Sequence, residues 1–469
     1  MSTSDYSAKY SAIALDLGTT SIKAGLMDHA GVLSHIIAAS APQIFLTYGH
    51  YESDALAYVA IAESVLNQCI TLAGDCKSMG LCSQRSSFLI WDPASGQTLT
   101  PLISWQDNRG AASCTALQAH EEAIRNLTGL PLTPYYFAPK LRIVLQENPE
   151  WRARLERGEL RVGTLDTFLI WRWSSGKYFM TDASMAARTQ LMDIRQQQWS
   201  PQLCAFFDIP LGILPEIKPS AGLSVRLDNG LILKASVGDQ SAALIASVRQ
   251  DQAEALANLG TGCFVVRYLP KREVSLEGYL QTLVYQDSEH HAHFAIEGTL
   301  NSIAAALAPY PVGECRSEDL AADDIFCVAE PSGLGAPYFR KEFGIRFSRP
   351  VEHLSQRRIA ALLLEAVIFR VVRILEDFHR ESALERVYLS GGLSELTCLQ
   401  QAIALCLPFE VYRLTQAESS LQGIGLLAVG RASAGDRVAV KVEVDGLTQA
   451  LPEKYERWKV WLDESLTLN

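Results

Sequence analysis

The stretch "AIALDLGTTSIKAGLMD" (residues 12–28) determines how the rest of the chain is interpreted. An apolar run leads to an aspartate, a Gly-Thr-Thr turn follows, and a second alternating run begins at once. Two such runs around a tight turn predict an antiparallel hairpin. The segment "ALANLGTGCFVVRYLP" (255–270) repeats this pattern in the second half of the chain. The repeat predicts two related domains, each with one copy of the hairpin.

The turn of this hairpin is suited to polyphosphate. It combines a glycine, which allows close approach of the backbone, with hydroxyl and amide donors: Gly18, Thr19, Thr20 and Ser21. Asp16 could hold a hydrated Mg²⁺, and Lys23 could neutralise a phosphate charge. A plain hairpin with a Thr-rich turn is the alternative for either copy alone. The turn is repeated, however, by Gly260, Thr261 and Gly262. We therefore expect two phosphate-binding hairpins that clamp one nucleotide in a cleft between the domains.

The segments that flank each hairpin follow one plan. Strands are expected at 12–17, 20–28 and 31–38, followed by a helix within 52–73. The second hairpin is followed by two more strands and by a long helix at 355–382, whose middle is apolar almost all round. Such a helix should be buried against a sheet. A meander before the first helix differs from the strand–helix alternation of a dinucleotide-binding fold.

The chain of 469 residues is too long for one ordinary core. The polar segment "SVRQDQAEA" separates two apolar runs near residues 240–254. We therefore expect an α/β protein of two duplicated domains, with a catalytic cleft between them. The expected domains are residues 1–246, with the acceptor and phosphate site, and 247–469, with the nucleotide site.

Composition limits the possible partners and location. The net charge of −11 gives no dominant basic patch and argues against nucleic acid as a partner. No apolar window is expected to reach the roughly 18 residues of a membrane span. The ten cysteines form no CxxC pair, and the N-terminus lacks a basic, apolar leader pattern. These features predict a cytoplasmic protein.

Many short sequence motifs of the chain, taken in order, resemble those of the FGGY carbohydrate kinases. This family belongs to the actin-like (ribonuclease H-like) ATPase superfamily, and the resemblance is to glycerol kinases in particular. Besides the two hairpins they are 80–109, 162–173, 181–194, 213–222, 237–244, 332–339, 389–396 and 452–461. Each motif alone is weakly specific, but the motifs occur in the order found in the family and span almost the whole chain.

This resemblance implies an ATP- and Mg²⁺-dependent phosphotransferase. The motif "GDQ" places Asp239 just after an apolar strand. This position suits a general base. By resemblance, Asp239 takes the proton of the acceptor hydroxyl as that hydroxyl attacks the γ-phosphate of ATP. We also expect Asp239 to share the Mg²⁺ with Asp16. A structural aspartate in a turn or a helix cap is the alternative for a bare GDQ.

The acceptor pocket is inferred from the same resemblance. Arg85 can fork two hydrogen bonds to vicinal hydroxyls, and Trp105 and Phe264 can form apolar walls. Tyr135 and Gln240 can hydrogen-bond acceptor oxygens. On the nucleotide side, Gly391 and Gly392 should let the backbone approach the α-phosphate and ribose, and Ala304 lies where the family usually has a glycine.

The sequence departs from the family at the acceptor pocket. Glycerol kinases follow the pocket arginine with a glutamate that grips a glycerol hydroxyl, but Ser86 stands here. A shorter, neutral side chain leaves room for a larger acceptor or a water. On the nucleotide side, Ala308 and Leu396 replace polar residues, which implies a more apolar adenine slot.

The leading hypothesis is therefore a kinase that phosphorylates a primary hydroxyl of a small polyol or sugar, with a glycerol-like acceptor first. A ketose kinase acting on ribulose, xylulose or a tetrulose is the alternative, because of Ser86. A catalytically silent nucleotide-binding homologue is the alternative from another class. The family is commonly dimeric or tetrameric, so the resemblance implies a homodimer or a homotetramer.

Overall fold

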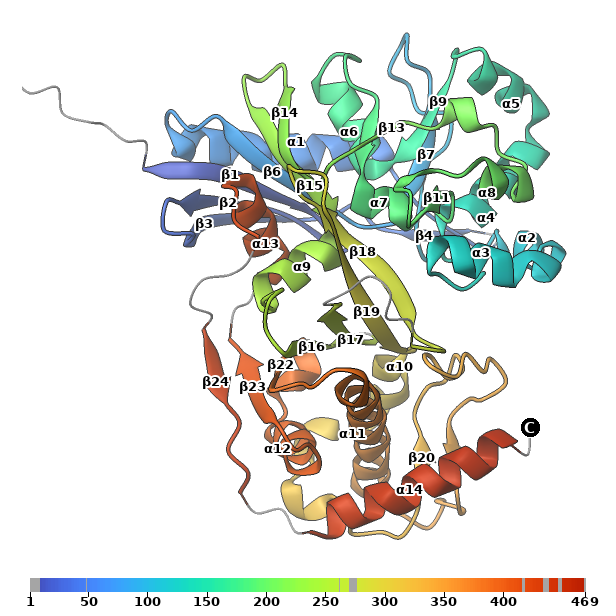
Figure 1. Ribbon diagram of the computed structural model, residues 1–469, viewed down its shortest axis with the longest axis vertical. Helices are drawn as coiled ribbons and strands as arrows, with labels where there is room; N and C mark the ends of the chain where they lie inside the picture. Colours follow the sequence, from blue (N-terminus) through green and yellow to red (C-terminus); the bar gives the residue numbers. More distant parts are fainter. Residues whose placement is uncertain are drawn as a thin grey trace, which may run out of the picture. The chain divides into compact units, whose positions relative to one another are not determined.

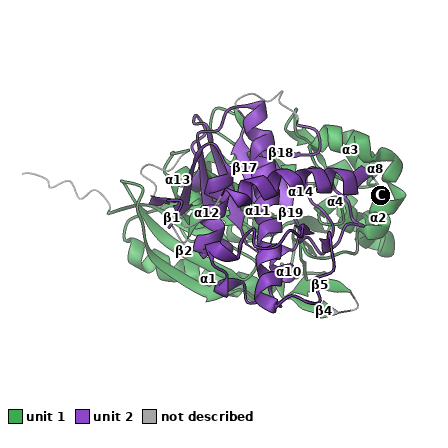
Figure 2. Ribbon diagram, turned by 90° about the horizontal axis from the view of Figure 1, so that it is seen from below, with its two compact units in different colours: residues 1–246, 281–294, 418–435 green, residues 247–280, 295–417, 436–469 purple. Residues whose placement is uncertain are grey.

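A computed structural model describes residues 9–47, 49–260, 262–269, 276–415, 418–432, 438–445 and 449–467. Thr261, predicted to bind ATP, lies outside these ranges. The chain forms two compact units, coloured in Figure 2. Unit 1 comprises Met1–Ala246, Gln281–Phe294 and Glu418–Gly435, and unit 2 comprises Ser247–Leu280, Ala295–Ala417 and Asp436–Asn469. Along the chain the first change of unit lies between Ala246 and Ser247, and two later segments are counted with unit 1.

Unit 1 is built on a six-stranded mixed sheet in the order β14-β15-β6-β1-β2-β3 (Figure 1). Its strands are β1 (Tyr10–Leu17), β2 (Ser21–Asp28), β3 (Leu33–Ser40), β6 (Ser78–Ser83), β14 (Ala221–Arg226) and β15 (Ile232–Gly238). β1 pairs antiparallel with β2 and parallel with β6, and β6 pairs parallel with β15. The predicted meander is thus one half of the sheet, and three parallel strands meet in the other half.

The sheet of unit 2 belongs to a seven-stranded sheet in the order β18-β19-β17-β16-β22-β23-β24, of which β18 from Gln281 onward and the first residues of β19 are counted with unit 1. Its strands are β16 (Glu254–Leu259), β17 (Cys263–Tyr268), β18 (Leu280–Gln286), β19 (Ala292–Leu300), β22 (Arg386–Ser390), β23 (Glu410–Leu414) and β24 (Ala439–Lys441). β16 pairs antiparallel with β17 and parallel with β22, and β22 pairs parallel with β23. Apart from β18, strand order and strand direction therefore repeat those of the six-stranded sheet of unit 1. The predicted duplicated two-domain α/β fold is confirmed.

Helices cover these sheets. They are α1 (Ala55–Ala73), α2 (Ala111–Ala116), α3 (Glu121–Thr128), α4 (Phe137–Glu147), α5 (Pro149–Glu156), α6 (Leu165–Trp173), α7 (Ala183–Ala187), α8 (Pro201–Phe206), α9 (Asp239–Ser247), α10 (Ile303–Leu307), α11 (Gln356–Glu381), α12 (Thr397–Cys406), α13 (Ser419–Ala428) and α14 (Ala450–Thr467). In unit 1, α13 packs closely on the sheet, because a Cβ on Gly80 of β6 would lie 2.6 Å from the Ile424 carbonyl oxygen. A helix from the end of the chain thus completes the first unit.

A second sheet of unit 1 has the order β4-β5-β8-β7-β9. Its strands are β4 (Phe45–Thr47), β5 (His50–Ser53), β7 (Phe88–Trp91), β8 (Leu102–Ile103) and β9 (Arg161–Thr164). Phe88, Ile90, Ile103 and Val162 from this sheet share one buried cluster with residues of α4. Short strand pairs complete the description: β10 (Met180–Asp182) with β13 (Glu216–Lys218), β11 (Met192–Asp193) with β12 (Gln198–Trp199), and β20 (Cys327–Val328) with β21 (Arg346–Phe347). The segments that flank β7, β8 and α4 carry four of the seven predicted acceptor residues: Arg85, Ser86, Trp105 and Tyr135.

The long helix α11 is the centre of the core of unit 2. Ser355 caps its first turn by accepting from the Arg358 N–H, and the apolar run 359–364 is buried. A Cβ on Gly298 of β19 would lie 2.6 Å from Ile374, so the helix lies directly on the sheet. The prediction of a helix buried against a sheet is confirmed.

The helix α1 departs from one sequence-based expectation. Among the described residues it alone is long and apolar enough to cross a membrane, with a mean hydropathy of 1.4 over 18 residues. Asp54 caps it, and its buried residues, Tyr58 and Val65 among them, belong to the same core cluster as β1 and β2. A single helix of this kind is weak support for a membrane span, because the core helix of a globular domain has the same composition. All ten cysteines are free, and nine of them are buried.

Candidate active site

Three parallel strands of unit 1 end at one edge of its sheet. Leu17 of β1 lies beside Ser83 of β6, and Ser83 lies beside Gly238 of β15. The segments that follow these strands are the Gly-Thr-Thr turn, Gln84–Arg85 and Asp239. Parallel strands place their carboxyl ends at the same edge, which is where α/β proteins bind ligands. Strand register therefore brings together predicted site residues that are far apart in the sequence.

Asp239 is the first residue of α9 and follows directly on β15. One carboxylate oxygen accepts from the Gln240 N–H at 2.8 Å and lies 3.7 Å from Nε of Arg85. The Asp239 side chain is 26% exposed, whereas that of Arg85 is 4% exposed. Burial raises the pKa of Asp239 above its usual value, and the charges of Arg85 and Arg188 act in the opposite direction. The result is a partly accessible carboxylate that is more basic than an ordinary aspartate.

Asp16 lies near the end of β1 and is almost fully buried. Its carboxylate accepts from the Ser420 hydroxyl at 2.8 Å and from the Cys82 thiol at 3.3 Å. Burial, together with the charge of Asp239, raises the pKa of Asp16 to about 6. The two carboxylates are therefore close enough to repel each other electrostatically.

This pair fits Mg²⁺ better than a metal held by protein ligands alone. Within the described ranges, no group of three or more His, Cys, Asp or Glu side chains could hold a metal ion. Mg²⁺ is usually bound by one or two carboxylates together with waters and substrate phosphates. A divalent cation would also relieve the repulsion that raises the pKa of Asp16.

The hairpin turn of unit 1 is tightly closed. The Gly18 N–H donates to the Ser21 carbonyl at 3.1 Å, and the Tyr58 hydroxyl donates to the Gly18 carbonyl at 2.6 Å. The Thr20 carbonyl accepts from Ala41, and the Thr20 side chain is exposed. The backbone of the turn is thus fixed, and the exposed hydroxyl of Thr20 remains accessible to a ligand.

Lys23 carries an ion pair that the sequence did not indicate. Its ammonium group lies 2.7 Å from Glu418, the residue before α13, and both side chains are about one quarter exposed. A phosphate bound by Lys23 would therefore share it with Glu418 or displace this carboxylate.

The predicted acceptor residue Trp105 contacts the hairpin turn Gly18–Ser21 directly. Its indole N–H donates to the Thr19 hydroxyl at 2.9 Å, and its ring lies against that of Tyr135, with centroids 5.2 Å apart. Its backbone N–H donates to the Ser87 hydroxyl at 2.9 Å. The aromatic pair and the turn therefore form one continuous surface.

Ser86 is buried and adopts a positive φ of 65°. Its hydroxyl donates to the Arg188 carbonyl at 3.1 Å. The donor of this hydroxyl is thus engaged by the protein backbone, while the oxygen can still accept a hydrogen bond. Gln240, next to Asp239, is partly buried in the first turn of α9.

Two buried cations near this edge were missed in the sequence. The guanidinium of Arg188 lies over the Tyr136 ring at 5.7 Å, and its charge lowers the pKa of Asp239. Lys140 is fully buried and donates to the Ser86 and Ser104 carbonyls at 3.0 and 2.8 Å. Burial lowers the pKa of Lys140 to about 7. A charged residue inside an otherwise apolar helical pattern is the signal that could have revealed Lys140.

The predicted nucleotide residues of unit 2 also gather at one sheet edge. Asn258 at the end of β16 lies beside Ser390 at the end of β22, and Cys263 of β17 lies beside Leu300 of β19. The register thus collects at one edge the segments that carry the predicted residues: Gly260 and Gly262, Ala304, and Gly391 and Gly392. Phe264 lies in β17 opposite Thr299, in unit 2, whereas the other predicted acceptor residues lie in unit 1.

The two glycines after β22 differ in their surroundings. Gly391 has a φ of 87°, and a Cβ there would lie 2.5 Å from the Leu259 carbonyl oxygen. No atom of the described residues lies within 4 Å of a Cβ on Gly392. Gly391 is therefore required by the packing of two strand ends, and Gly392 leaves open space in front of the turn.

A buried ion pair holds a neighbouring loop in unit 2. Arg370 of α11 donates to Glu330 at 2.8 Å, and both side chains are only 1% exposed. The other Glu330 oxygen accepts from the backbone N–H groups of Asn301 and Gly335. This carboxylate, which the sequence analysis did not single out, fixes the segment that follows β19.

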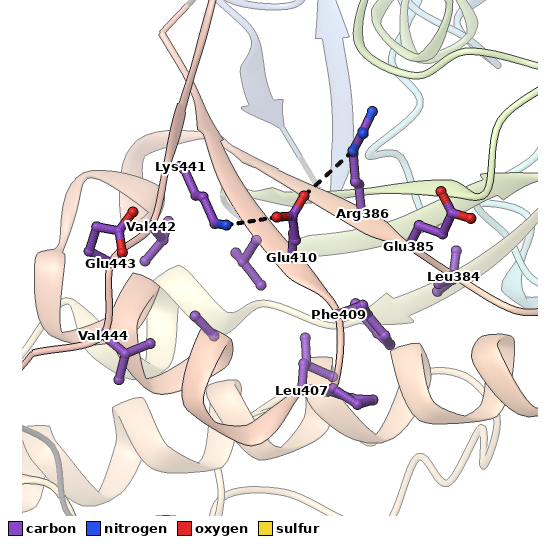
Figure 3. A pocket seen from close by; sticks show the side chains of 13 residues that line it. Leu384, Glu385, Arg386, Leu407, Phe409, Glu410, Lys441, Val442, Glu443 and Val444 are labelled. Atoms are coloured by element: carbon purple, nitrogen blue, oxygen red, sulfur yellow. Dashed lines mark hydrogen bonds and ion pairs between the residues drawn. The ribbon is translucent and has the colours of Figure 1, made fainter.

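A separate pocket of about 770 Å³ lies in unit 2 (Figure 3). It is lined by residues 384–386, 404, 407–411 and 441–444, and in it Glu410 lies 2.7 Å from Lys441 and 3.7 Å from Arg386. Arg386 and Glu410 begin β22 and β23, so the pocket lies at the opposite edge of the sheet from Gly391. It is not part of the predicted nucleotide site.

Comparison with known proteins agrees with this geometry. Residues 11–257 match the N-terminal domain, and residues 255–431 the C-terminal domain, of the FGGY family of carbohydrate kinases. A glycerol kinase of Xanthobacter autotrophicus is 31% identical over 89% of both chains, and one of Cereibacter sphaeroides is 32% identical over the same shares.

Solved structures show the same fold. A Plasmodium falciparum glycerol kinase structure with ADP superposes with a TM-score of 0.84 at 23% identity, covering 97% of each chain. A Brucella ovis xylulose kinase structure superposes with a TM-score of 0.83 at 21% identity, covering 98% of this chain and all of the other. Fold, site and relatives together define an ATP-dependent kinase of sugars or polyols. The chain belongs to the FGGY family of carbohydrate kinases.

Proposed function

We propose that the chain transfers the γ-phosphoryl group of ATP to a primary hydroxyl of a small polyol or sugar, with Asp239 as the general base. One observation carries this proposal. The Asp239 carboxylate lies at the shared strand edge, 3.7 Å from Arg85, and has a raised pKa. A general base is most effective when its pKa lies near the working pH. The raised pKa of Asp239 is closer to this condition than the pKa of an exposed aspartate.

The proposed reaction is an in-line displacement. The acceptor hydroxyl gives its proton to the Asp239 carboxylate as its oxygen forms a bond to the γ-phosphorus. The bond from that phosphorus to the bridging oxygen breaks, and ADP leaves. Phosphoryl transfer needs mainly positioning and charge neutralisation, so the protein supplies few covalent steps.

We assign the nucleotide contacts of each half of the chain separately. In the first half we assign to the phosphates the exposed turn of the first hairpin, Gly18 to Ser21, and Lys23. In residues 247–469 we assign Gly260, Thr261, Gly262, Ala304, Gly391 and Gly392 to the nucleotide. Asp16 and Asp239 would hold Mg²⁺, which neutralises charge on the β- and γ-phosphates when it is bound.

The acceptor site is proposed in residues 1–246, with Phe264 added from the second half. Arg85 would bind neighbouring hydroxyls of the acceptor, and Trp105 and Tyr135 would cover its carbon face. Gln240 would bind a further oxygen. The curated relatives favour glycerol as the first acceptor to test.

A ketose is the second candidate, and Ser86 favours it. The family glutamate that grips a glycerol hydroxyl is absent, and the Ser86 hydroxyl donates to the Arg188 carbonyl instead. A site that lacks one of its hydroxyl partners discriminates poorly in favour of the smaller acceptor.

An assay of ADP release with ATP and Mg²⁺ tests the proposal. The acceptors to compare are glycerol, erythritol, erythrulose, ribulose, xylulose and ribitol. Strong ADP release with one of them supports the proposal and identifies the acceptor. Binding of ATP without ADP release on any of them would overturn it and would favour a catalytically silent homologue.

We further propose a cytoplasmic enzyme that forms a homodimer or a homotetramer. The ten free cysteines support a reducing compartment. Light scattering of the purified protein measures its oligomeric state, and a monomeric mass would contradict this part of the proposal.

A further inference from the structure

A buried polar cluster lies behind the end of β15, outside the groups that would touch the substrate. Its centre is Asp182, which is fully buried at the start of α7. Its carboxylate accepts from the backbone N–H groups of Ser184 and Met185 at 2.8 and 3.2 Å, and from the Ser220 hydroxyl at 2.6 Å. Both carboxylate oxygens therefore have donors, and α7 is fixed at its first turn.

Ser184 connects this cluster to the residue before Asp239. Its hydroxyl oxygen accepts from the Gly238 N–H at 2.9 Å, and its backbone N–H donates to the Asp182 carboxylate at 2.8 Å. The interactions therefore run from Asp182 through Ser184 to the peptide that leads into Asp239. Every group in this series is buried.

The same peptide is confined on its other side by Arg85. A Cβ on Gly238 would lie 2.8 Å from Cδ and 2.9 Å from Cγ of Arg85. The hydrogen bond to Ser184 and the contact with Arg85 leave the Gly238 peptide little room to rotate. Rotation of this peptide would change the direction of the Asp239 side chain and its distance to Arg85.

We propose that Ser184 and Asp182 are positioning residues for the general base. They hold the Gly238 peptide so that the Asp239 carboxylate faces the acceptor hydroxyl and stays beside Arg85. This inference rests on the proposed function, in which Asp239 removes the proton of the acceptor. A displacement of a catalytic group by about 1 Å can lower the rate by roughly 100-fold.

Ser220 extends the cluster to other strands of unit 1. Its hydroxyl accepts from the Gln286 N–H at 3.1 Å, and its carbonyl accepts from the Ser236 N–H of β15 at 2.8 Å. The cluster is therefore attached to β15 at two points, near Ser236 and at Gly238. This double attachment makes the direction of Asp239 depend on the cluster rather than on β15 alone.

Substitution of Ser184 tests the inference. Ser184→Ala removes the acceptor of the Gly238 N–H, and Ser184→Thr keeps a hydroxyl in the same place. The matched control is Ser200→Ala, because Ser200 is another buried serine of unit 1 whose hydroxyl accepts from a backbone N–H, that of Leu203, at 3.3 Å. For each variant, kcat, KM for ATP and for the acceptor, the pH profile of kcat and the melting temperature are measured.

We expect Ser184→Ala to lower kcat by about 10- to 100-fold while KM for ATP changes little. The acid limb of its pH profile should move to higher pH, because Asp239 moves away from the cation that lowers its pKa. Ser184→Thr should recover most of kcat. Ser200→Ala should lower only the melting temperature.

Three outcomes would overturn the inference: a folded Ser184→Ala variant with wild-type kcat and pH profile, no recovery in Ser184→Thr, or an equal kcat loss in Ser200→Ala. If Ser184→Ala does not fold, Asp182→Asn is used, with the same expected loss and pH shift. An Asp239→Asn variant measured in parallel separates the two proposals. Turnover in Asp239→Asn contradicts the proposed function, whereas an inactive Asp239→Asn beside a fully active Ser184→Ala contradicts only the inference.

Discussion

Arg85 is the residue that links acceptor binding to the reactivity of Asp239. It is buried, yet its Nε lies 3.7 Å from the partly exposed Asp239 carboxylate. Its charge lowers the pKa of this carboxylate, whereas burial raises it. The balance between the two effects sets the pH at which the base loses its proton.

Arg85→Met should move the acid limb of the kcat/KM profile to higher pH. Removal of the cation raises the pKa of Asp239, and the base works only after its proton is lost, so activity begins at a higher pH. Arg85→Lys keeps the charge and should shift the limb less, although both variants should raise KM for the acceptor. An acid limb that stays in place in Arg85→Met would contradict this assignment.

Ser86→Glu should raise kcat/KM for glycerol relative to the ketoses. The change restores the carboxylate that glycerol kinases carry after the pocket arginine, at a position whose φ of 65° is already outside the usual region. Ser86→Ala is the control, because it removes the hydrogen bond to Arg188 without adding a carboxylate. An unchanged ratio of glycerol to ketose activity in Ser86→Glu would show that this position does not select the acceptor.

At the scale of elements, the two hairpins and the strands that follow them carry the residues proposed for the site. The predicted strands 12–17 and 20–28 correspond to Tyr10–Leu17 and Ser21–Asp28, because alternation and turn residues are local signals. The alanine-rich segment "LNSIAAALA" (residues 300–308) forms only a short helix, α10. β19 extends to Leu300, and Ser302 adopts a φ of 54°, so α10 begins only at Ile303. Sheet pairing outweighs helix propensity at this point.

Gly391→Ala should weaken ATP binding and destabilise unit 2. A Cβ would meet the Leu259 carbonyl at 2.5 Å, and the φ of 87° is unfavourable for alanine, so the ends of β16 and β22 must separate. Gly313→Ala is the matched control, because within the described part of the chain no atom lies within 4 Å of its Cβ, and its φ is not positive. Calorimetric titration with ATP measures the effect, and wild-type affinity in Gly391→Ala would contradict the role of this turn.

At the scale of the whole molecule, motifs in the sequence indicate the candidate site residues but few of the residues that contact them. Asp16, Arg85 and Asp239 follow from motifs, and the fold they imply is confirmed. Ser420 and Glu418 could not be predicted, because they reach Asp16 and Lys23 only through the packing of a helix about 400 residues further along the chain. Long-range packing leaves no local pattern in the sequence.

Buried carboxylates should also make the stability depend on pH. Burial, with the charge of Asp166, raises the pKa of Asp182 to about 7 from 3.8. Between about pH 4 and pH 7 the folded protein therefore binds a proton at Asp182 that the unfolded chain has lost. This contribution to the free energy of unfolding is fully present at acid pH and disappears as the pH rises towards 7.

Asp182→Asn should therefore reduce the loss of stability between pH 4.5 and pH 7.5, whatever its effect at a single pH. Asp228→Asn is the control, because Asp228 is exposed and its pKa is lowered, so it titrates below this range. Urea unfolding at several pH values measures both. An identical pH slope in wild type and Asp182→Asn would contradict a raised pKa of Asp182.

The measurement that tests the central claim most directly compares wild type with Asp239→Asn. ADP release is followed with the most active acceptor, and ATP affinity is measured on the same samples. The account predicts a loss of turnover of at least about 100-fold with ATP binding retained, because the amide cannot take the proton of the acceptor. Retention of more than about a hundredth of the wild-type rate would contradict Asp239 as the general base.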